Sequence, residues 1–229
     1  GATSRRVVDA VARALGMKTV GHAGTLDPLA EGVVVVCVGH ATKLVDAIHS
    51  LPKFYAASFL LGRSSPSDDF ETPIELEADP AVPTREAIEA ALPAFRGDIL
   101  QRPCDYSAVH VDGKRAYRLA RKGRAVVLAA KPVRIDALDV TAYEWPRLAL
   151  EIACSSGTFV RAIGRDLAEA LGTKAVMESL VRTAVGPFVR ERSLPLAAVT
   201  PESARAGLGP ALAAAPGLPR LVLEGDLLD

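Results

Sequence analysis

The sequence lacks an excess of charge of either sign, because its 229 residues carry 27 Lys and Arg against 27 Asp and Glu. Bulk attraction to a polyanion is therefore excluded, and any nucleic-acid site must be a local patch. Long apolar runs are also missing: the longest run of Val, Leu and Ile, residues 33–36, is far too short to cross a bilayer. With 49% hydrophobic and 24% charged residues, the composition is globular rather than disordered.

Cysteine is scarce: the chain has only Cys37, Cys104 and Cys154. They are odd in number, lie far apart in the sequence and form no C-x-x-C motif. Neither a disulfide framework nor a zinc site is expected from this pattern. The cysteine pattern favours the reducing cytoplasm. No apolar stretch follows Arg5 and Arg6, so we expect no secretory signal. An initial Met is missing too, so we expect trimming or processing.

The phosphate-loop pattern G-x-x-x-x-G-K-[ST] is absent from the sequence, which disfavours nucleotide hydrolysis as the function.

Hydrophobic spacing predicts both helices and strands. The expected helices cover residues 3–15, 84–95, 158–171 and 173–181, and Pro93 should end the second of them early. The expected strands cover residues 33–38, 55–61, 133–140 and 148–154, the first of them buried on both faces. Because there is no regular βαβ alternation and no internal repeat, we predict a mixed α/β (α+β) fold around a mainly antiparallel central sheet flanked by helices and loops.

Two segments of opposite charge cancel each other in the total. Residues 68–89 are acidic, whereas residues 112–124 are basic, with Lys114, Arg115, Arg118, Arg121, Lys122 and Arg124. On a helix, Arg118, Arg121 and Lys122 would form one cationic edge beside Tyr117 that could neutralise several phosphates. A solvated helix face explains the same pattern equally well.

The densest cluster of chemically useful residues is GHAGTLDPLAEG, residues 21–32. Its glycines let the backbone approach a ligand, and Asp27 before Pro28 sits on a turn that would pre-orient a carboxylate for nucleophilic or acid–base chemistry. An ordinary turn initiator gives the same Asp-Pro pair. His22 could contact a base or simply tie down the loop.

Further candidates lie near strand ends. Tyr55 begins an expected strand, where its ring is either core or a stacking surface with a polar edge. Residues 154–161 run from a strand end into a helix start, and Arg161 falls off the apolar stripe of that helix, which ordinarily means an exposed arginine. Cys154 as a nucleophile would need a His, and none is near it in the sequence.

Several collinear blocks between residue 1 and about residue 190 resemble the TruB family, bacterial enzymes that convert uridine 55 of the tRNA TΨC loop to pseudouridine. The matching segments are Gly1-x-Thr3-Ser4, GHAGTLDPLAEG (21–32), GHATK (39–43), Tyr55–Gly62, YSA (106–108), GKRAYRLARKG (113–123), CSSGT (154–158), Arg161 and LVRT (180–183). The number and order of these blocks make a chance match very unlikely.

The resemblance implies the pseudouridine synthase fold and a set of site residues. Asp27 would be the catalytic aspartate, Arg161 would pair with it and keep it charged in an apolar pocket, and Tyr55 would take part in catalysis. The flipped uridine would be bound by His22, Tyr55, Phe159 and Leu180, and the RNA by Lys114, Arg115, Arg118, Arg121 and Lys122. The reaction has no net redox change, so no cofactor and no metal are expected. The expected partner is the tRNA TΨC stem-loop, with no membrane and with the chain as a monomer.

The resemblance also divides the chain. Residues 1–190 would be the catalytic domain, with an RNA-contacting segment at about 105–125. Residues 191–229 would be an extension without the complete C-terminal RNA-binding (PUA-like) domain of most members. Phe159 stands where the family usually has Tyr, and residues 64–69 and 102–105 also depart from the family pattern.

Two other functions fit the sequence. One is a non-catalytic tRNA-binding or tRNA-folding protein on the same fold. The other is an aspartate-nucleophile hydrolase of a small glycoside, with Glu31 as the only local second carboxylate. For the isomerase itself, attack by Asp27 and formation of a glycal are both open routes.

Overall fold

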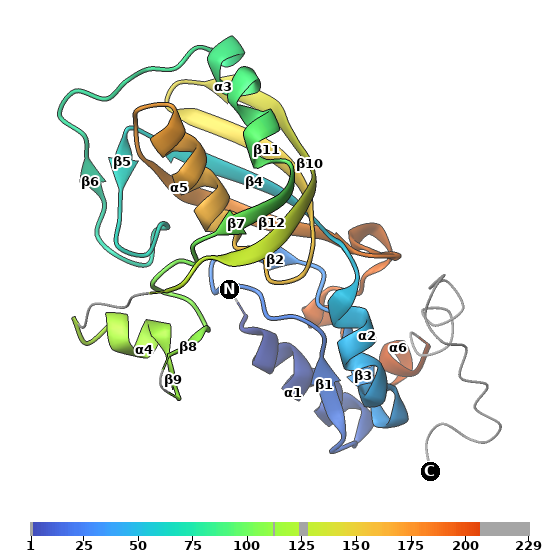
Figure 1. Cartoon of the computed structure of the whole chain (residues 1–229). Coiled ribbons are helices and arrows are strands. Elements are labelled where there is room, and N and C mark those ends of the chain that lie inside the picture. The colour runs from blue at the N-terminus through green and yellow to red at the C-terminus, as the bar shows by residue number, and fades with distance from the viewer. Residues whose placement is uncertain (1, 112, 124–127, 207–229) are drawn as a thin grey trace. The chain divides into compact units, whose positions relative to one another are not determined.

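The computed structural model describes residues 2–111, 113–123 and 128–206 (Figure 1). Arg124 of the basic segment and residues 207–229 of the expected extension lie outside this range. The chain divides into two compact units, one formed by the chain up to Phe54 together with the chain from Val181 onward, the other by Tyr55–Leu180. Within the described residues, no helix has the length and apolar character needed to cross a bilayer. The proposed boundary at residue 190 stays a prediction.

The first unit packs short helices and strands around a small apolar core. Its elements are α1 (Ser4–Leu15), β1 (Val20–His22), β2 (Glu31–Gly32), β3 (Val36–Val38), η1 (Gly39–Leu44), α2 (Val45–Ser50), β13 (Phe188–Val189), η3 (Arg190–Arg192), η4 (Leu196–Ala198) and α6 (Pro201–Ala206). The expected first helix is confirmed: the Thr3 side chain accepts the Arg6 N–H, and Gly16 closes the helix in the left-handed conformation. A buried apolar cluster of this unit contains Ala23, Val33, Cys37, Leu44, Ile48 and Val185.

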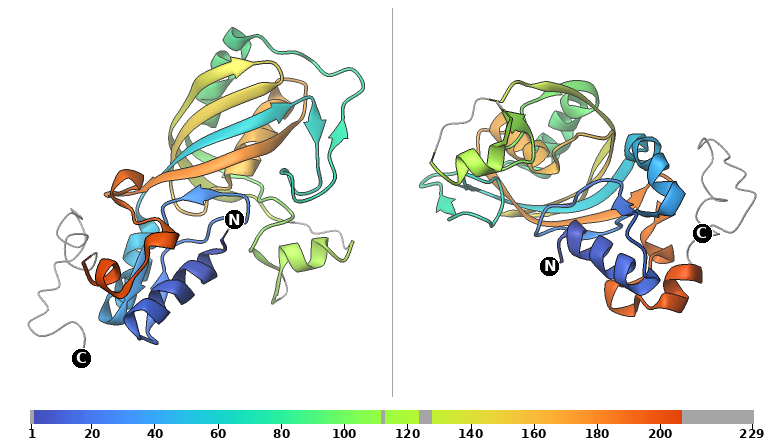
Figure 2. Two further views of the ribbon diagram at one scale, coloured as in Figure 1. Left: turned by 180° about the vertical axis from the view of Figure 1, so that it is seen from behind. Right: turned by 90° about the horizontal axis from the view of Figure 1, so that it is seen from below.

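The second unit holds the long strands. Its elements are β5 (Arg63–Ser64), β6 (Glu75–Leu76), α3 (Arg85–Ala91), η2 (Leu92–Phe95), β7 (Gly97–Gln101), β8 (His110–Val111), β9 (Lys114–Arg115), α4 (Ala116–Ala120), β10 (Lys131–Glu144), β11 (Arg147–Cys154) and α5 (Val160–Ala170). Two further strands, β4 (Lys53–Leu61) and β12 (Ala175–Val185), continue from one unit into the other. Figure 2 shows the strands of the second unit curving around α5.

The main sheet confirms the predicted mixed, mainly antiparallel architecture. Its strand order is β13-β12-β4-β11-β10-β7, and β2 also pairs with β12. The pairs of β10 with β11 and β7 and of β12 with β13 are antiparallel, whereas β2 and β12 are parallel. The expected strands at 55–61, 133–140 and 148–154 are confirmed as parts of β4, β10 and β11, because alternating residues bury one face of each. Pro93 ends α3 as expected, leaving the 3-10 turn η2.

The predicted helix over residues 173–181 is wrong, since this segment is the strand β12. Its residues include good helix formers, yet β12 lies between β4 and β13 in the sheet and also pairs with β2, so these strands supply the backbone partners that a strand needs. Tertiary pairing therefore overrides local propensity. The predicted strand at 33–38 is also shorter than expected: only Val36–Val38 form β3, and Val34 to Val36 are half-buried rather than fully buried on both faces.

Helix α5 lies directly against strand β4, which generates a test of the packing. A Cβ added to Gly164 would come within 2.1 Å of the Phe59 ring, and Phe59 is almost fully buried. Replacing a helical Gly by Ala gains about 1 kcal/mol in propensity, but overpacking of a core costs about 1–3 kcal/mol. We therefore expect Gly164→Ala to lower the free energy of unfolding, measured by denaturant titration.

Gly21→Ala is the matched control, because a Cβ at Gly21 meets no atom of the described part of the chain within 4 Å. It should change the free energy of unfolding by less than about 0.5 kcal/mol. Equal stability of the Gly164→Ala variant and the parent would contradict this packing.

Candidate functional site

In the first unit, Asp27 lies at the first position of a tight turn. The Ala30 N–H donates to the Asp27 carbonyl at 2.9 Å, with Pro28 and Leu29 as the central residues. Proline suits the second position of such a turn because its φ is already fixed. The expected fixed turn is thus present, and the Asp27 side chain is half-buried on it.

Arg182 holds the loop that carries this turn. It is 1% exposed, and its guanidinium donates to the carbonyls of Val33 (2.7 Å), Gly24 (3.2 Å) and Thr25 (3.5 Å). A buried guanidinium needs an acceptor for each donor, so its burial forces these carbonyls to converge on it. Sequence reasoning noted Arg182 only as part of a motif and gave it no role.

Two further contacts fix the same loop. The Leu26 N–H donates to the buried hydroxyl of Ser4 at 3.0 Å, which ties the residue before Asp27 to the start of α1. Gly32 has a φ of 103°, and a Cβ there would lie 2.1 Å from the Arg182 carbonyl oxygen. Only glycine fits where β2 passes so close to β12.

His22 lies at the end of β1, at the start of this loop. Burial lowers its pKa; the Gly24 backbone opposes this, and the positive charges of Arg182 and Arg5 add to the lowering. The lowered pKa favours the neutral imidazole. Its Nδ1 is buried and has no hydrogen-bond partner among the described residues.

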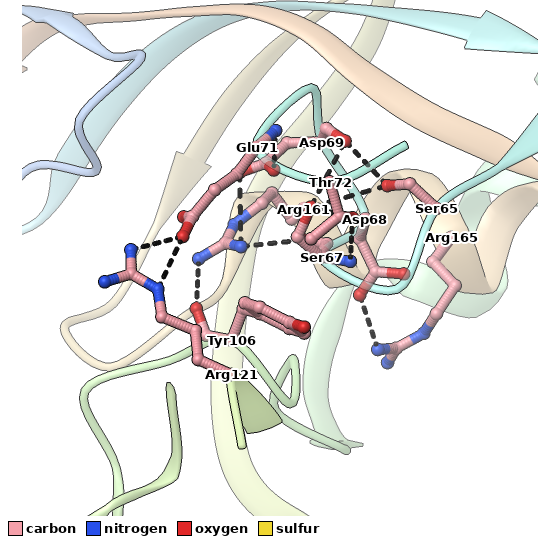
Figure 3. A network of polar contacts seen from close by, with 10 residues as sticks. All are labelled: Ser65, Ser67, Asp68, Asp69, Glu71, Thr72, Tyr106, Arg121, Arg161 and Arg165. Carbon is pink, nitrogen blue, oxygen red and sulfur yellow. Dashed lines mark hydrogen bonds and ion pairs between the residues drawn. The ribbon is translucent and has the colours of Figure 1, made fainter. Parts of the chain in front are cut away.

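In the second unit, Arg161 lies in the first turn of α5 and is 4% exposed (Figure 3). Its Nη1 donates to the Ser67 carbonyl at 2.7 Å and lies 3.2 Å from Asp69 Oδ2, and its Nη2 donates to the Tyr106 carbonyl at 3.0 Å. The ordinary interpretation of an exposed arginine is thus wrong. The side chain falls off the apolar stripe of α5 but is covered by two loops of its own unit.

Asp69 is a residue that sequence reasoning missed, since it was counted only as part of an acidic stretch. It is 2% exposed and ion-paired, and its backbone carbonyl accepts the Ser65 and Ser67 hydroxyls at 2.6 and 3.2 Å. The Thr72 hydroxyl binds the Ser67 N–H at 3.1 Å, and Asp69 Oδ1 binds the Glu71 N–H at 2.9 Å. These contacts make residues 65–72 an ordered loop around the arginine (Figure 3).

A second buried arginine lies one turn further along α5. Arg165 forms ion pairs with Asp68 at 3.1 Å and Asp166 at 2.8 Å, and donates to the Arg102 carbonyl at 2.7 Å. Burial raises the pKa of Asp68, although the neighbouring Arg165 charge opposes this. Burial likewise raises the pKa of the adjacent Cys104 thiol, which argues against a reactive cysteine there.

The other predicted uridine-binding residues of this unit occupy three different elements. Tyr55 is half-buried in β4, Leu180 is buried in β12, the strand next to β4, and Phe159 is half-buried immediately before α5. The structure thus brings Phe159 and Arg161 together at one helix start. His22 and Asp27 belong to the first unit, so the pairing of Asp27 with Arg161 stays a prediction.

The basic segment forms a cationic groove in the second unit. A cavity of about 580 Å³ is lined by Lys114, Tyr117, Arg118, Leu119, Arg121 and Lys122. The guanidinium carbons of Arg118 and Arg121 lie 6.0 and 5.3 Å from the centre of the Tyr117 ring, which is cation–π distance. Arg121 also pairs with Glu71 of the ordered loop (Figure 3).

The basic segment is helical only in part. Helix α4 ends at Ala120, and Arg121 is its C-cap, because Gly123 follows with a φ of 68° and the chain turns there. Lys114 and Arg115 lie on β9 instead. All five predicted RNA-binding residues nevertheless belong to this one compact segment, and four of them line the groove.

Comparison with known sequences places these features in a family. The sequence model of the TruB family pseudouridylate synthase N-terminal domain matches residues 12–160. A protein of Gloeobacter violaceus described as tRNA pseudouridine synthase B is 46% identical over 203 residues, covering 87% of this chain and 69% of that protein. One of Mycobacterium avium with the same description is 45% identical over 197 residues, covering 84% and 64%. This chain spans about two thirds of the length of these relatives.

Solved structures share the fold. A chain from the crystal structure of a Cbf5-Nop10-Gar1 complex superposes with a TM-score of 0.62 at 28% identity, over 82% of this chain and 47% of that one. A chain of an archaeal box H/ACA sRNP Nop10-Cbf5 complex gives 0.61 at 24% identity, over 89% and 49%. The expected pseudouridine synthase fold is thereby confirmed, and the chain spans about half of these longer proteins.

Sequence identity near 45% over more than four fifths of the chain, a matching domain model and a shared fold agree: this chain belongs to the TruB family of pseudouridylate synthases.

Proposed function

We propose that this chain isomerises uridine to pseudouridine at position 55 in the TΨC loop of tRNA. The observation that carries the proposal is the GTLDP turn in this chain, which belongs to the family. Its aspartate, Asp27, lies on a fixed turn in a loop that the buried Arg182 holds. The family description names the reaction, and the relatives' names specify tRNA. A tRNA substrate implies a cytoplasmic enzyme, and we propose that it acts as a monomer.

The reaction breaks the N–C glycosidic bond of uridine, turns the base and forms a C–C bond to the same sugar. Asp27 serves either as a nucleophile on the sugar or base, or as the base that forms a glycal. Its fixed turn lowers the entropic cost of bringing the carboxylate to the reacting carbon. The uridine must first leave its stack, at a cost of a few kcal/mol that stacking on aromatic rings and apolar packing can offset.

The binding residues divide this work. Tyr55, Phe159 and Leu180 supply apolar and aromatic surface for the extruded base, and the neutral His22 supplies a polar edge. Arg161 keeps the Asp27 carboxylate ionised, because an adjacent positive charge favours the charged form. The basic groove holds phosphates of the stem-loop, which positions the RNA without reading its sequence.

The competing function is tRNA binding or folding without catalysis, since the basic groove by itself supports it. It predicts RNA affinity with no release of the C5 hydrogen of uridine. The isomerase replaces that hydrogen when the new C–C bond forms, so release of tritium from C5-labelled uridine in tRNA separates the two functions.

Asp27→Asn should abolish pseudouridine formation, because the amide keeps the size of the side chain but removes its negative charge and nucleophilicity. The turn hydrogen bond uses the main-chain oxygen, so folding should be unchanged. The measurement is tritium release, with tRNA affinity and thermal stability as companions. Glu31→Gln is the matched control on the same loop and should stay active. Substantial turnover by Asp27→Asn would exclude the mechanism. Hydrolysis of a nucleoside or small glycoside in the absence of RNA would instead favour the two-carboxylate hydrolase.

Arg161→Ala should lower the turnover rate by about 100-fold or more, comparable to the loss of one charge-stabilising donor in an active site. Removing a buried ion-pair partner also destabilises the fold, so the rate is compared with that of Arg165→Ala, one helical turn away. Arg165 has the same kind of buried network. Both variants should melt at lower temperature, but Arg165→Ala should turn over at nearly the parental rate. Equal rates of the two variants would remove Arg161 from catalysis.

Replacing Arg118 and Arg121 together by Ala should weaken tRNA binding and flatten its salt dependence. Each lost phosphate contact reduces the slope of log affinity against log salt by about 0.7–0.9. The control is the pair Arg85→Ala and Arg134→Ala, which removes the same charge from exposed sites elsewhere in the unit. An unchanged slope in the first double variant would make the basic segment an ordinary solvated surface.

A further inference from the structure

The chain contains no asparagine and a single glutamine, Gln101. This residue ends β7 and is 2% exposed. Its Oε1 accepts the Phe159 N–H at 2.8 Å, and its Nε2 donates to the Phe159 carbonyl at 3.1 Å. The only carboxamide side chain of the protein is therefore buried and bound, through both of its polar ends, to the main chain of one residue.

This pair of bonds fixes the backbone at the start of α5. Phe159 is the N-cap residue, with φ −97° and ψ 106°, and among the described residues no side chain caps the helix. In this extended conformation the Phe159 N–H lies outside the helical hydrogen-bond ladder, and its carbonyl already accepts the Ile163 N–H at 3.3 Å. The carboxamide binds this N–H and shares the carbonyl, as a neighbouring strand would. Among the twenty side chains, only a carboxamide offers a donor and an acceptor in one plane at all pH values.

The contact is the first in a row between α5 and the segment after β7. Two residues further along the helix, Arg161 donates to the Tyr106 carbonyl at 3.0 Å, and Arg165 donates to the Arg102 carbonyl at 2.7 Å. Residues 101–106 thus provide acceptors for the first two turns of α5. Among these contacts, the one made by Gln101 lies at the start of the helix, on Phe159 itself.

The connection between β11 and α5 is consequently held at both of its ends. At its start, the Arg134 N–H donates to the Ser155 hydroxyl at 3.0 Å and the Ser155 N–H donates to the Arg134 carbonyl at 2.8 Å. At its end, Gln101 holds Phe159. A loop fixed at both ends loses little further entropy when a ligand binds to it.

We propose that Gln101 is a positioning residue for the uridine site and acts through Phe159; this rests on the proposed function. The Phe159 ring has no hydroxyl, so no hydrogen bond from the ring can orient it, and its place depends on packing and on the main chain that carries it. Stacking on an extruded base needs the ring at one distance and angle. The carboxamide supplies that constraint.

The test compares single-turnover rates of pseudouridine formation at saturating enzyme, using tritium release from tRNA. Gln101→Met keeps the length of the side chain and removes both hydrogen bonds. We expect its rate to fall about 10-fold or more, because small displacements of a positioning group cost up to about 100-fold in rate. Its tRNA dissociation constant should stay within about 2-fold, because the phosphate contacts of the basic groove are untouched.

A double-mutant cycle identifies the route of the effect. If Gln101 acts through Phe159, adding Gln101→Met to Phe159→Ala should slow the reaction no further than Phe159→Ala alone. Independent effects that multiply would overturn the proposal, and so would a parental rate for Gln101→Met. Gln101→Glu keeps the acceptor for the Phe159 N–H and loses the donor; it should also be slowed, and it decides the question if Gln101→Met does not fold.

The control is Tyr143→Phe, which removes a side-chain hydrogen bond of 2.6 Å to the Pro83 carbonyl in the same unit, away from α5. It should lower the melting temperature without changing the rate constant, as a merely structural role would. Tritium release by the parent enzyme distinguishes failure of the proposed function from failure of the proposed role of Gln101. A parent that releases no tritium refutes the proposed function, whereas an active parent with an equally fast Gln101→Met refutes the role of Gln101.

Discussion

Burial of guanidinium groups is the constraint on which both units depend. An arginine stays charged in proteins and carries five donors, so it can be buried only where several acceptors converge on it. Arg182 meets this requirement with three carbonyls, and Arg161 meets it with one carboxylate and two carbonyls. Most of these acceptors belong to irregular segments, so each arginine orders the loops around it. An unmatched guanidinium in either place would cost several kcal/mol.

The ordered loops are the ones that carry the candidate chemistry. Arg182 holds the loop with Asp27, so the carboxylate stands on a backbone that is defined before any substrate arrives. In the other unit, Arg161 is anchored through Asp69 in a loop that also pairs with Arg121 of the basic groove. The groups proposed to bind RNA and the group proposed to tune the aspartate thus belong to one connected set of contacts (Figure 3).

Local signals in the sequence predicted much of the fold. The first helix carries its own cap and stop residues, and strands β4, β10 and β11 carry an alternating pattern that tertiary contacts reinforce. The prediction for β12 failed because its residues suit a helix nearly as well, and two of the strands that pair with it, β4 and β2, lie far earlier in the chain. The turn at Asp27 was predictable because Asp-Pro is a local signal, whereas the burial of Arg161 and Asp69 depends on loops about 55 to 95 residues away.

The sequence by itself determined the chemical inventory and the family: an Asp-Pro turn within a glycine-rich loop, a compact basic segment and collinear motif blocks, because these are properties of neighbouring residues. Only the tertiary structure decided which polar side chains are buried and what they hold. Gln101 and Phe159 lie 58 residues apart, and Arg182 and Gly24 lie 158 apart. Hydrogen bonds between such residues arise from chain folding, which no local pattern records.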